Sequence, residues 1–392
     1  MSRFPAPRTA GPQVSWGKIA AVVYLPTALF EIGIGAINAV LALDAHGLGA
    51  SIAISSVIVS LLGVGQIVGD IPAGSLATKI GDRKAMLFGA FASTLVLVVC
   101  ALASTWKVLL VTIFLLGAIN AIFMLARQAY LTEIAPPHLR ARAFSTMGGV
   151  QRIGMLVGPF IGAWVIDKFG LHGIYWLAVV MAIASAIVVL VIPDPELPPP
   201  PPPASDVVAS GAQSGDEAGQ AKSSATTWGL VRNNLGLLAS LGVGVLLVGA
   251  IRAIRFAAVP LWSEHIGLSA SMTSAVVGLS GLFDIALFYP AGKVMDVKGR
   301  MWVAVPSMAL LGAGIMLLPV AHTLGALIAI AALIGIGNGI GAGIIMTTGA
   351  DAAPVDGRAK FLSVWRFMSD FGGAAGPLII SLGTALGSLV GG

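Results

Sequence analysis

Ionisable side chains inside long apolar segments are the residues of this sequence best placed to do chemistry. Glu31 stands among Leu, Phe, Ile and Gly residues, where the loss of water favours the neutral carboxyl over the charged one. That preference suits a group that binds and releases a proton. Glu31 is therefore a candidate for proton coupling or cation binding, with an ion pair to Arg252 or Arg255, or a local structural role, as the alternatives. Asp284 and Asp370 are further candidates for proton coupling.

Other polar residues in these segments are candidates for substrate binding. Arg252 and Arg255 could bind an anionic substrate group, or they could pair with the carboxylates. Asn120 and Asn338 could contact substrate or form hydrogen bonds between helices. Gln151 and its neighbour Arg152 complete this set.

Further charged residues have structural interpretations as well. Arg152 and Asp370 lie 218 positions apart, which is the offset of an internal repeat, and they could meet across the interface of two related halves. Arg366 and Asp370 have the i,i+4 spacing that allows an ion pair on one helix face. Asp70 and Arg127 are expected near the inner membrane surface, where their side chains could reach water and anchor a gate or loop.

The composition predicts an all-α membrane protein. The 392 residues are 57% hydrophobic and 10% charged, whereas soluble domains carry about 25% charged residues. Eleven segments are long and apolar enough to span a membrane. They cover residues 19–43, 52–76, 85–104, 108–133, 143–166, 172–192, 237–262, 270–292, 301–320, 323–349 and 360–386.

Several kinds of chemistry are not expected. The single cysteine, Cys100, excludes an intramolecular disulfide and a cysteine-based metal site. The five histidines show no metal-ligand spacing, and no nucleophile stands beside a base. The glycine-rich run 335–343 lacks the Lys-Ser/Thr of a phosphate-binding loop, so we interpret it as close helix packing. We therefore expect no metal, no cofactor and no enzymatic activity.

The distribution of Lys and Arg predicts the orientation. Fifteen fall in the loops on one side of the predicted bundle, and two, Lys107 and Lys168, fall on the other. The positive-inside rule places the richer side, with the N-terminus, in the cytoplasm. We expect a multi-pass protein of the inner cell membrane and interpret the net charge of +5 as a topology signal rather than a nucleic-acid surface.

A repeat at an offset of 218 relates the two parts of the chain. Its plainest element is a short polar, basic stretch at residues 74–84, which recurs at residues 292–300, each time after Pro-Ala. We expect both stretches to be cytoplasmic loops that act in gating. The residues concerned are Gly74, Gly81, Asp82, Arg83, Gly292, Asp296, Gly299 and Arg300.

The repeat predicts two pseudo-symmetric six-helix halves, as in transporters that hold substrate between halves near mid-membrane. We expect a cytoplasmic N-terminus over residues 1–18, a first half over 19–193 and a second half over 237–392. Residues 194–236 include six consecutive prolines and predict a disordered cytoplasmic linker, or else a docking site for another protein. The twelfth helix would fall beyond Gly392, so it is expected to be absent, through truncation or in a natural eleven-helix protein.

These features resemble the major facilitator superfamily, particularly its bacterial drug:proton antiporters, over most of the chain. Gly74 and Gly81 match the family's loop between helices 2 and 3. Thr78 stands where the family usually has Asp, whereas the second copy has Asp296. The resemblance therefore implies that Asp296 rather than Thr78 would act as an acidic latch.

The fifth segment resembles the family's antiporter motif. The matching positions are Gly154, Gly158, Pro159 and Gly162. Uptake members of the family usually lack this motif, so it favours export. Ile113 stands at the place of the family's helix 4 arginine, which is linked there to proton coupling.

The resemblance implies a secondary active exporter that moves a small amphipathic molecule outward against inward proton flow by alternating access. Proton symport that imports a small nutrient is the alternative, and the pair Arg252 and Arg255 would then favour an anion. A receptor-like or scaffolding membrane protein is the third interpretation. The expected partners are a small-molecule substrate, protons and the lipid bilayer, not nucleic acid, and the protein is expected to be a monomer.

Overall fold

The computed structural model describes residues 16–135, 139–193, 232–354 and 358–386. Most of the predicted N-terminal segment, most of the predicted linker and the last six residues lie outside this part of the chain. Within it, ten helices are long and apolar enough to cross a membrane.

Some of these spanning helices combine two or three adjoining elements. In chain order they are η1 (Ala20–Tyr24) with α2 (Leu25–Gly47), α3 (Ile52–Ile80), α4 (Asp82–Ala101), α5 (Trp106–Ile134), α6 (Arg140–Phe169), α7 (Gly173–Val191), α9 (Leu235–Leu237) with η3 (Leu238–Gly242) and α10 (Val243–His265), α11 (Ala270–Lys298), α12 (Met301–Leu317) with η4 (Leu318–Val320), and α13 (Leu324–Ile340) with α14 (Ile344–Ala352).

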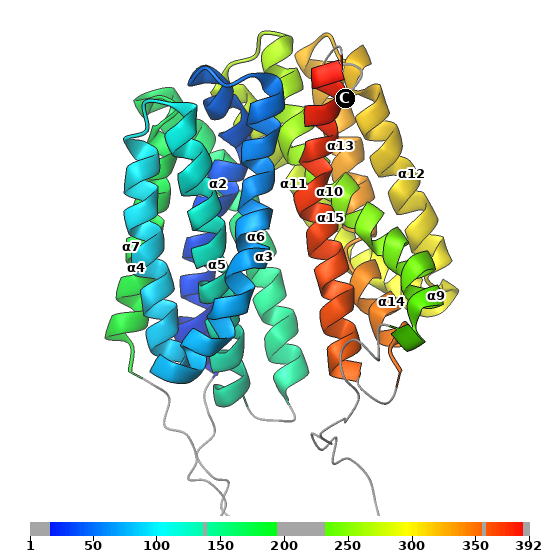
Figure 1. Ribbon diagram of the computed structural model, residues 1–392. Helices are drawn as coiled ribbons and strands as arrows, with labels where there is room; N and C mark the ends of the chain where they lie inside the picture. The colour runs from blue at the N-terminus through cyan, green and yellow to red at the C-terminus, as the bar shows by residue number, and fades with distance from the viewer. Residues whose placement is uncertain (1–15, 136–138, 194–231, 355–357, 387–392) are drawn as a thin grey trace, which may run out of the picture.

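The eleventh predicted segment corresponds to α15 (Arg358–Leu386). This helix is as long as the others and packs along α10 and α3 (Figure 1). It is less apolar, because its first half carries Arg366, Asp370 and several small residues. The predicted all-helical membrane fold is confirmed. In the described part of the chain, ten helices are long and apolar enough to span a membrane, and α15 packs beside them.

The helices form two groups. In the first group, α2 packs against α6 and α7, and α5 packs against α3 and α4. In the second group, α10 packs against α15, and α13 packs against α11 and α12. The groups meet mainly where α3 lies along α15 and where α6 lies along α11.

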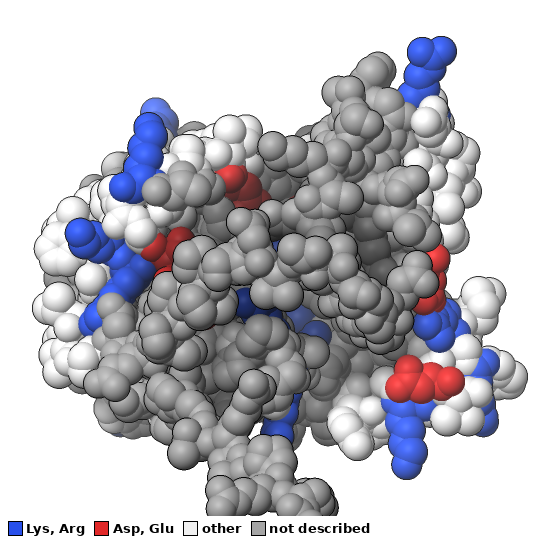
Figure 2. Space-filling model, turned by 90° about the horizontal axis from the view of Figure 1, so that it is seen from below, with Lys and Arg blue, Asp and Glu red and all other residues white. Residues whose placement is uncertain are grey.

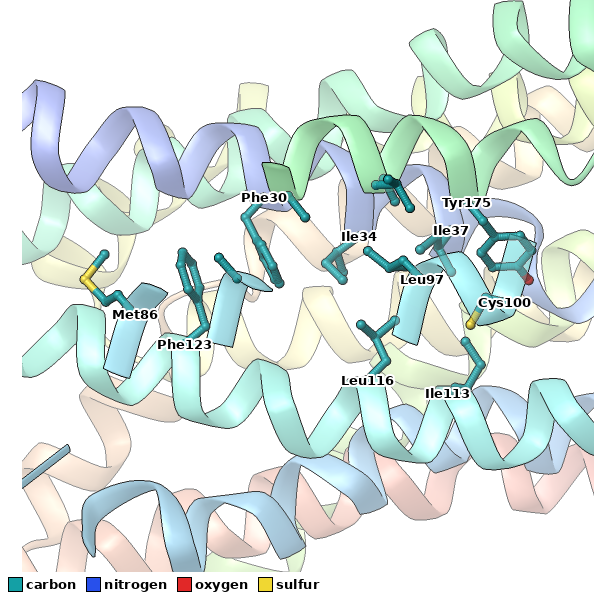
Figure 3. Packing of buried hydrophobic residues seen from close by; sticks show 14 of the residues in the cluster. Phe30, Ile34, Ile37, Met86, Leu97, Cys100, Ile113, Leu116, Phe123 and Tyr175 are labelled. Carbon is teal, nitrogen blue, oxygen red and sulfur yellow. The ribbon is translucent and has the colours of Figure 1, made fainter. Parts of the chain in front are cut away.

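The largest apolar core lies inside the first group. It is built by side chains from α2, α4, α5 and α7 (Figure 3). The rings of Phe30 and Phe123 stack with their centroids 4.5 Å apart. This core fixes the rotation of α2 and α5 about their own axes, and so decides which of their polar side chains face each other.

The internal repeat is visible in local backbone structure. The Ser51 hydroxyl accepts a hydrogen bond from the backbone N–H of Ile54, and Ser269 does the same for Met272 at the start of α11. Gly81 and Gly299 follow equivalent helices with φ angles of 85° and 96°. Such angles favour glycine, because a side chain would be strained there. The sequence repeat therefore preserves helix starts and turns.

The structure corrects the expected loops at residues 74–84 and 292–300. The α3 helix continues to Ile80 and only Gly81 separates it from α4, while α11 continues to Lys298. A helix satisfies its own backbone hydrogen bonds, so it can extend past the apolar layer with exposed basic side chains such as Lys79. Polar composition here marked helix ends rather than loops.

The two groups are joined at one end of the bundle. We call this end the Gly49 side and the opposite end, which carries Gly81 and Gly299, the Gly81 side. On the Gly49 side, His46 of α2 lies 3.8 Å from Glu264 of α10. An apolar cluster next to them contains Ala42, Ala257, Leu261 and Ile380. Toward the Gly81 side, at the bottom of Figure 1, α3 and α15 diverge.

Candidate functional site

A cavity of about 680 Å³ lies between the two groups of helices. Its walls come from α2, α3, α5 and α6 on one side and from α10, α11, α13 and α15 on the other. Nine side chains predicted as candidates for proton coupling or substrate binding line it. They are Glu31, Asn120, Gln151, Arg152, Arg252, Arg255, Asp284, Asn338 and Asp370. The structure thus brings all nine to one place, although they come from seven helices.

Glu31 lies in the wall that α2 and α6 form together. Its side chain is 10% exposed. Gln151 Nε2 donates a hydrogen bond to Glu31 Oε1 over 3.0 Å. Gly154 of α6 lies against Glu31, because a Cβ added to this glycine would come within 2.7 Å of Glu31 Cβ. The close approach of α6 at Gly154 therefore sets Gln151 against the carboxylate.

Arg127 is the counter-charge of Glu31, a partner that the sequence pattern did not predict. Its Nη1 lies 3.5 Å from Glu31 Oε1, and its side chain is fully buried. The prediction that Arg127 reaches water near the membrane surface is wrong, because neighbouring helices cover α5 at this level. The sequence could have indicated this pair through the distance of each residue from its helix end. Glu31 and Arg127 both lie about two to three helical turns from the same side of the bundle.

Asp284 on α11 is the centre of the polar contacts in the second group. Asn338 Nδ2 on α13 donates a hydrogen bond to Asp284 Oδ2. Arg255 Nη2 on α10 lies 3.7 Å from the same oxygen. Arg152 Nη1 lies 3.4 Å from Asp284 Oδ1 and reaches it from α6 of the first group. Asp284 therefore connects two elements of its own group and one of the other.

The pairing of Arg152 with Asp370 that the repeat suggested does not occur. Arg152 contacts Asp284, and Arg366 Nε lies 3.5 Å from Asp370 Oδ2 within α15. The physical reason is that α6 packs on α11 while α15 packs on α3. Equivalent positions in two related halves are not positions that face each other.

Arg252 stands one helical turn before Arg255 and also faces the cavity. One of its Nη groups donates a hydrogen bond to the carbonyl oxygen of Gly341. That carbonyl lies where α13 ends and the chain turns into α14. In the part of the chain that the structure describes, Nε of Arg252 and Nε of Arg255 are buried without a hydrogen-bond partner.

The residues predicted to act in gating hold helix ends on the Gly81 side. Arg83 donates hydrogen bonds to the carbonyl oxygens of Val189 and Ile192 at the end of α7, the first over 2.6 Å. A cation at this place also complements the helix dipole. Arg300 forms a bidentate pair with Asp351 at 2.7 and 3.1 Å. Asp296 is exposed.

The glycines predicted as an antiporter motif lie against α2. A Cβ added to Gly158 would collide with the carbonyl oxygen of Ile32, and one added to Gly162 would meet Ala36. The carbonyl oxygen of Pro159 accepts a hydrogen bond from Ser274 of α11 over 2.7 Å. The motif therefore brings α2 and α6 into contact beside Glu31 and also touches the other group.

This arrangement of helices and cavity is matched by known proteins. Residues 23–377 match the family model described as Major Facilitator Superfamily. The chain belongs to the Major Facilitator Superfamily. It is a multi-pass membrane transporter and not an enzyme, and the resemblance stated from sequence is confirmed at the level of the family.

Curated relatives of this transporter match part of its length. It is 28% identical to multidrug resistance protein MdtG of Proteus mirabilis over 163 residues, which are 41% of this chain and 40% of that protein. It is 27% identical to MdtG of Enterobacter lignolyticus over 175 residues, 43% of this chain and 42% of that protein. The chain thus spans about two fifths of the length of these relatives.

Solved structures of major facilitators share the fold. A bacterial homologue of the human lysosomal transporter Spinster, inward-facing and unoccupied, has a TM-score of 0.72 at 15% identity, with 94% of this chain and 82% of that chain covered. The nucleoside transporter NupG has a TM-score of 0.71 at 13% identity, with 94% and 91% covered. At these identities the likeness concerns the fold alone.

Proposed function

We propose that this major facilitator exports a small amphipathic molecule from the cytoplasm in exchange for protons. The Gly81 side would face the cytoplasm, because exposed basic residues such as Lys79, Lys84, Lys293 and Lys298 gather there (Figure 2). The contacts on the Gly49 side then close the cavity from the outside. This conformation would receive substrate from the cytoplasm.

The observation that carries the proposal is the pair formed by Glu31 and Arg127 at the edge of the cavity. Protonation of Glu31 would remove one buried charge and leave Arg127 without its counter-charge. The two protonation states therefore favour different packing of α2 against α5 and α6. A carboxyl group with this property can couple proton binding to rocking of the halves. We assign the contacts seen here to the proton-released form.

Partial similarity to multidrug resistance proteins, and the resemblance of Gly154, Gly158, Pro159 and Gly162 to an antiporter motif, support export over uptake. One observation favours import instead. Arg152 and Arg255 share Asp284, and protonation of Asp284 would free these two arginines for an anion, so that proton and anion would bind together. Such linkage is the thermodynamic signature of symport.

Everted membrane vesicles with an acidic interior distinguish the two directions. Naphthoate and naphthylmethylammonium, added outside, serve as probes, and a pH-sensitive dye reports the gradient. Antiport predicts that a transported probe dissipates the gradient, because protons leave as the probe enters. Symport predicts no dissipation, together with accumulation of the probe by whole cells.

Glu31→Gln should abolish the dissipation, because an amide carries no transferable proton. Asp167→Asn is the matched control, since that carboxylate is exposed on the Gly49 side and, among the residues that the structure describes, forms an ion pair only with the adjacent Lys168. Undiminished dissipation by Glu31→Gln would remove Glu31 as the proton carrier. Symport behaviour of the unmodified protein would replace export by import.

A further inference from the structure

We propose that the cavity binds its substrate through an anionic group, a carboxylate or a phosphate-type oxyanion, held between Arg152, Arg252 and Arg255. This inference rests on the proposed transport function in either direction. It names the chemical class of the substrate, which the family membership leaves open.

The first argument is the charge balance of the cavity. Its charged lining consists of three arginines and three carboxylates. Two of the carboxylates have arginines of their own outside this lining, because Glu31 pairs with Arg127 and Asp370 pairs with Arg366. The three lining arginines are therefore left with one carboxylate, Asp284.

The second argument is that the three guanidinium groups converge. Arg252 and Arg255 follow each other by one turn on α10, and Arg152 arrives from α6 on the opposite wall. Arg152 and Arg255 contact the two different oxygens of Asp284. Two cations that contact the same carboxylate repel each other, most strongly in a medium of low dielectric constant. An additional anion would relieve the repulsion.

The third argument is the supply of unused donors. Arg252 donates to the carbonyl oxygen of Gly341, but its Nε, like Nε of Arg255, is buried without a partner among the described residues. Guanidinium groups match the two oxygens of a carboxylate or phosphate in geometry as well as charge. A buried donor left unpaired is unfavourable. An oxyanion that accepts hydrogen bonds from these donors would remove that cost, and its binding would be more favourable for this reason.

The other side chains that line the cavity indicate the chemistry of the rest of the substrate. Apolar side chains also line the cavity, among them Val59, Leu62, Met124 and Val277. Arg152 also lies over the ring of Phe288, with its Cζ 4.6 Å from the centroid. A molecule with an apolar or aromatic body and one anionic end would fill both parts. The volume of about 680 Å³ admits a small molecule of this kind.

Asp284 then acts as an internal competitor of the substrate. Its carboxylate occupies Arg152 and Arg255 when no anion is bound. A substrate oxyanion would share or take over these arginines, while Asn338 keeps the Asp284 side chain in place. Removing the charge of Asp284 should therefore strengthen anion binding, whereas removing an arginine should weaken it.

The test measures binding to the purified full chain in detergent by the shift of its thermal unfolding. The probes are naphthoate, naphthyl phosphate, the neutral naphthamide and naphthylmethylammonium, which share one aromatic body. We expect saturable stabilisation by the two anions and little by the amide or the ammonium. Stabilisation by the ammonium that equals or exceeds that by naphthoate would overturn the proposal.

Variants locate the site. Arg255→Gln should weaken naphthoate binding by about tenfold or more, because a charge-assisted hydrogen bond is lost. Arg152→Gln should do the same and serves if the first variant does not fold. Arg232→Gln is the matched control, since that arginine is exposed on the Gly81 side. Asp284→Asn should bind naphthoate more tightly than the unmodified chain. Unchanged binding by both arginine variants, or weaker binding by Asp284→Asn, contradicts the proposal.

These outcomes are separable from those of the transport assay. Anion binding with no movement of protons in vesicles would reject the proposed antiport and leave the anion site intact. Proton-coupled transport of the ammonium probe with no anion binding would reject the anion site and leave antiport intact.

Discussion

At the scale of single residues, partners rather than depth explain the buried charges of this transporter. Arg127 lies deep in α5 without any exposure and is tolerated because Glu31 is within 3.5 Å. Its guanidinium also lies beside the ring of Phe123, at 5.8 Å. Removing one member of a buried ion pair leaves the charge of the other uncompensated. This lowers the stability of the folded protein far more than replacing both members.

Arg127→Gln should therefore destabilise the protein by about 3–5 kcal/mol. The same substitution in the Glu31→Gln background should have a much smaller effect, because no carboxylate is then left unpaired. Unfolding of the purified single and double variants measures this coupling. Arg366→Gln breaks an exposed pair and should change stability by less than about 1 kcal/mol. If the effects of Glu31→Gln and Arg127→Gln on the free energy of unfolding are additive, Glu31 and Arg127 are not coupled.

At the scale of helices, glycines decide which elements approach closely enough to share polar side chains. Gly158 on α6 lies against the backbone of α2, and Gly376 at the equivalent place on α15 lies against Ala250 of α10. A membrane offers little hydrophobic drive between helices, so close packing of small residues contributes much of the association. The glycines predicted as an antiporter motif thus also pack helices against each other.

Gly158→Ala should destabilise the protein by about 1–3 kcal/mol, because the added methyl group forces α2 and α6 apart. It should also disturb the hydrogen bond between Gln151 and Glu31 and slow transport. Gly149→Ala on the same helix is the control, since nothing lies within 4 Å of an added Cβ there. Equal thermal stability of the two variants would show that the contact at Gly158 tolerates a side chain.

At the scale of the whole molecule, the contacts between the two groups on the Gly49 side would correspond to one state of the proposed transport cycle. They comprise the pair of His46 with Glu264 and the apolar cluster around Ala257 and Leu261. Both must separate if the halves rock to open the cavity on that side. The polar bridge from Arg152 to Asp284 would have to change in the same movement.

Covalent linkage across this side should stop transport. The variant combines His46→Cys with Glu264→Cys in a Cys100→Ala background, because Cys100 is the only other thiol. A short bifunctional thiol reagent should abolish probe transport, and each single cysteine variant treated in the same way should keep it. Full transport by the cross-linked protein would rule out opening at the Gly49 side.

Composition and periodicity alone determined the class of this protein and the position of its helices, because spanning a membrane requires a local run of apolar residues. They also identified the polar residues of the cavity, since a charge in such a run needs a functional or structural reason. The repeat located equivalent positions, and the family motifs pointed to the superfamily. All of this information is carried by neighbouring residues or by a fixed offset.

Only the tertiary structure decided which of these residues meet. Side-chain partners depend on how each helix is rotated about its axis and on which helix lies beside it, and neither is encoded in local hydrophobicity. For this reason Arg127 rather than Arg252 or Arg255 pairs with Glu31, and Arg152 reaches Asp284 rather than Asp370. The same packing leaves Arg152, Arg252 and Arg255 around a single carboxylate, which points to the class of substrate.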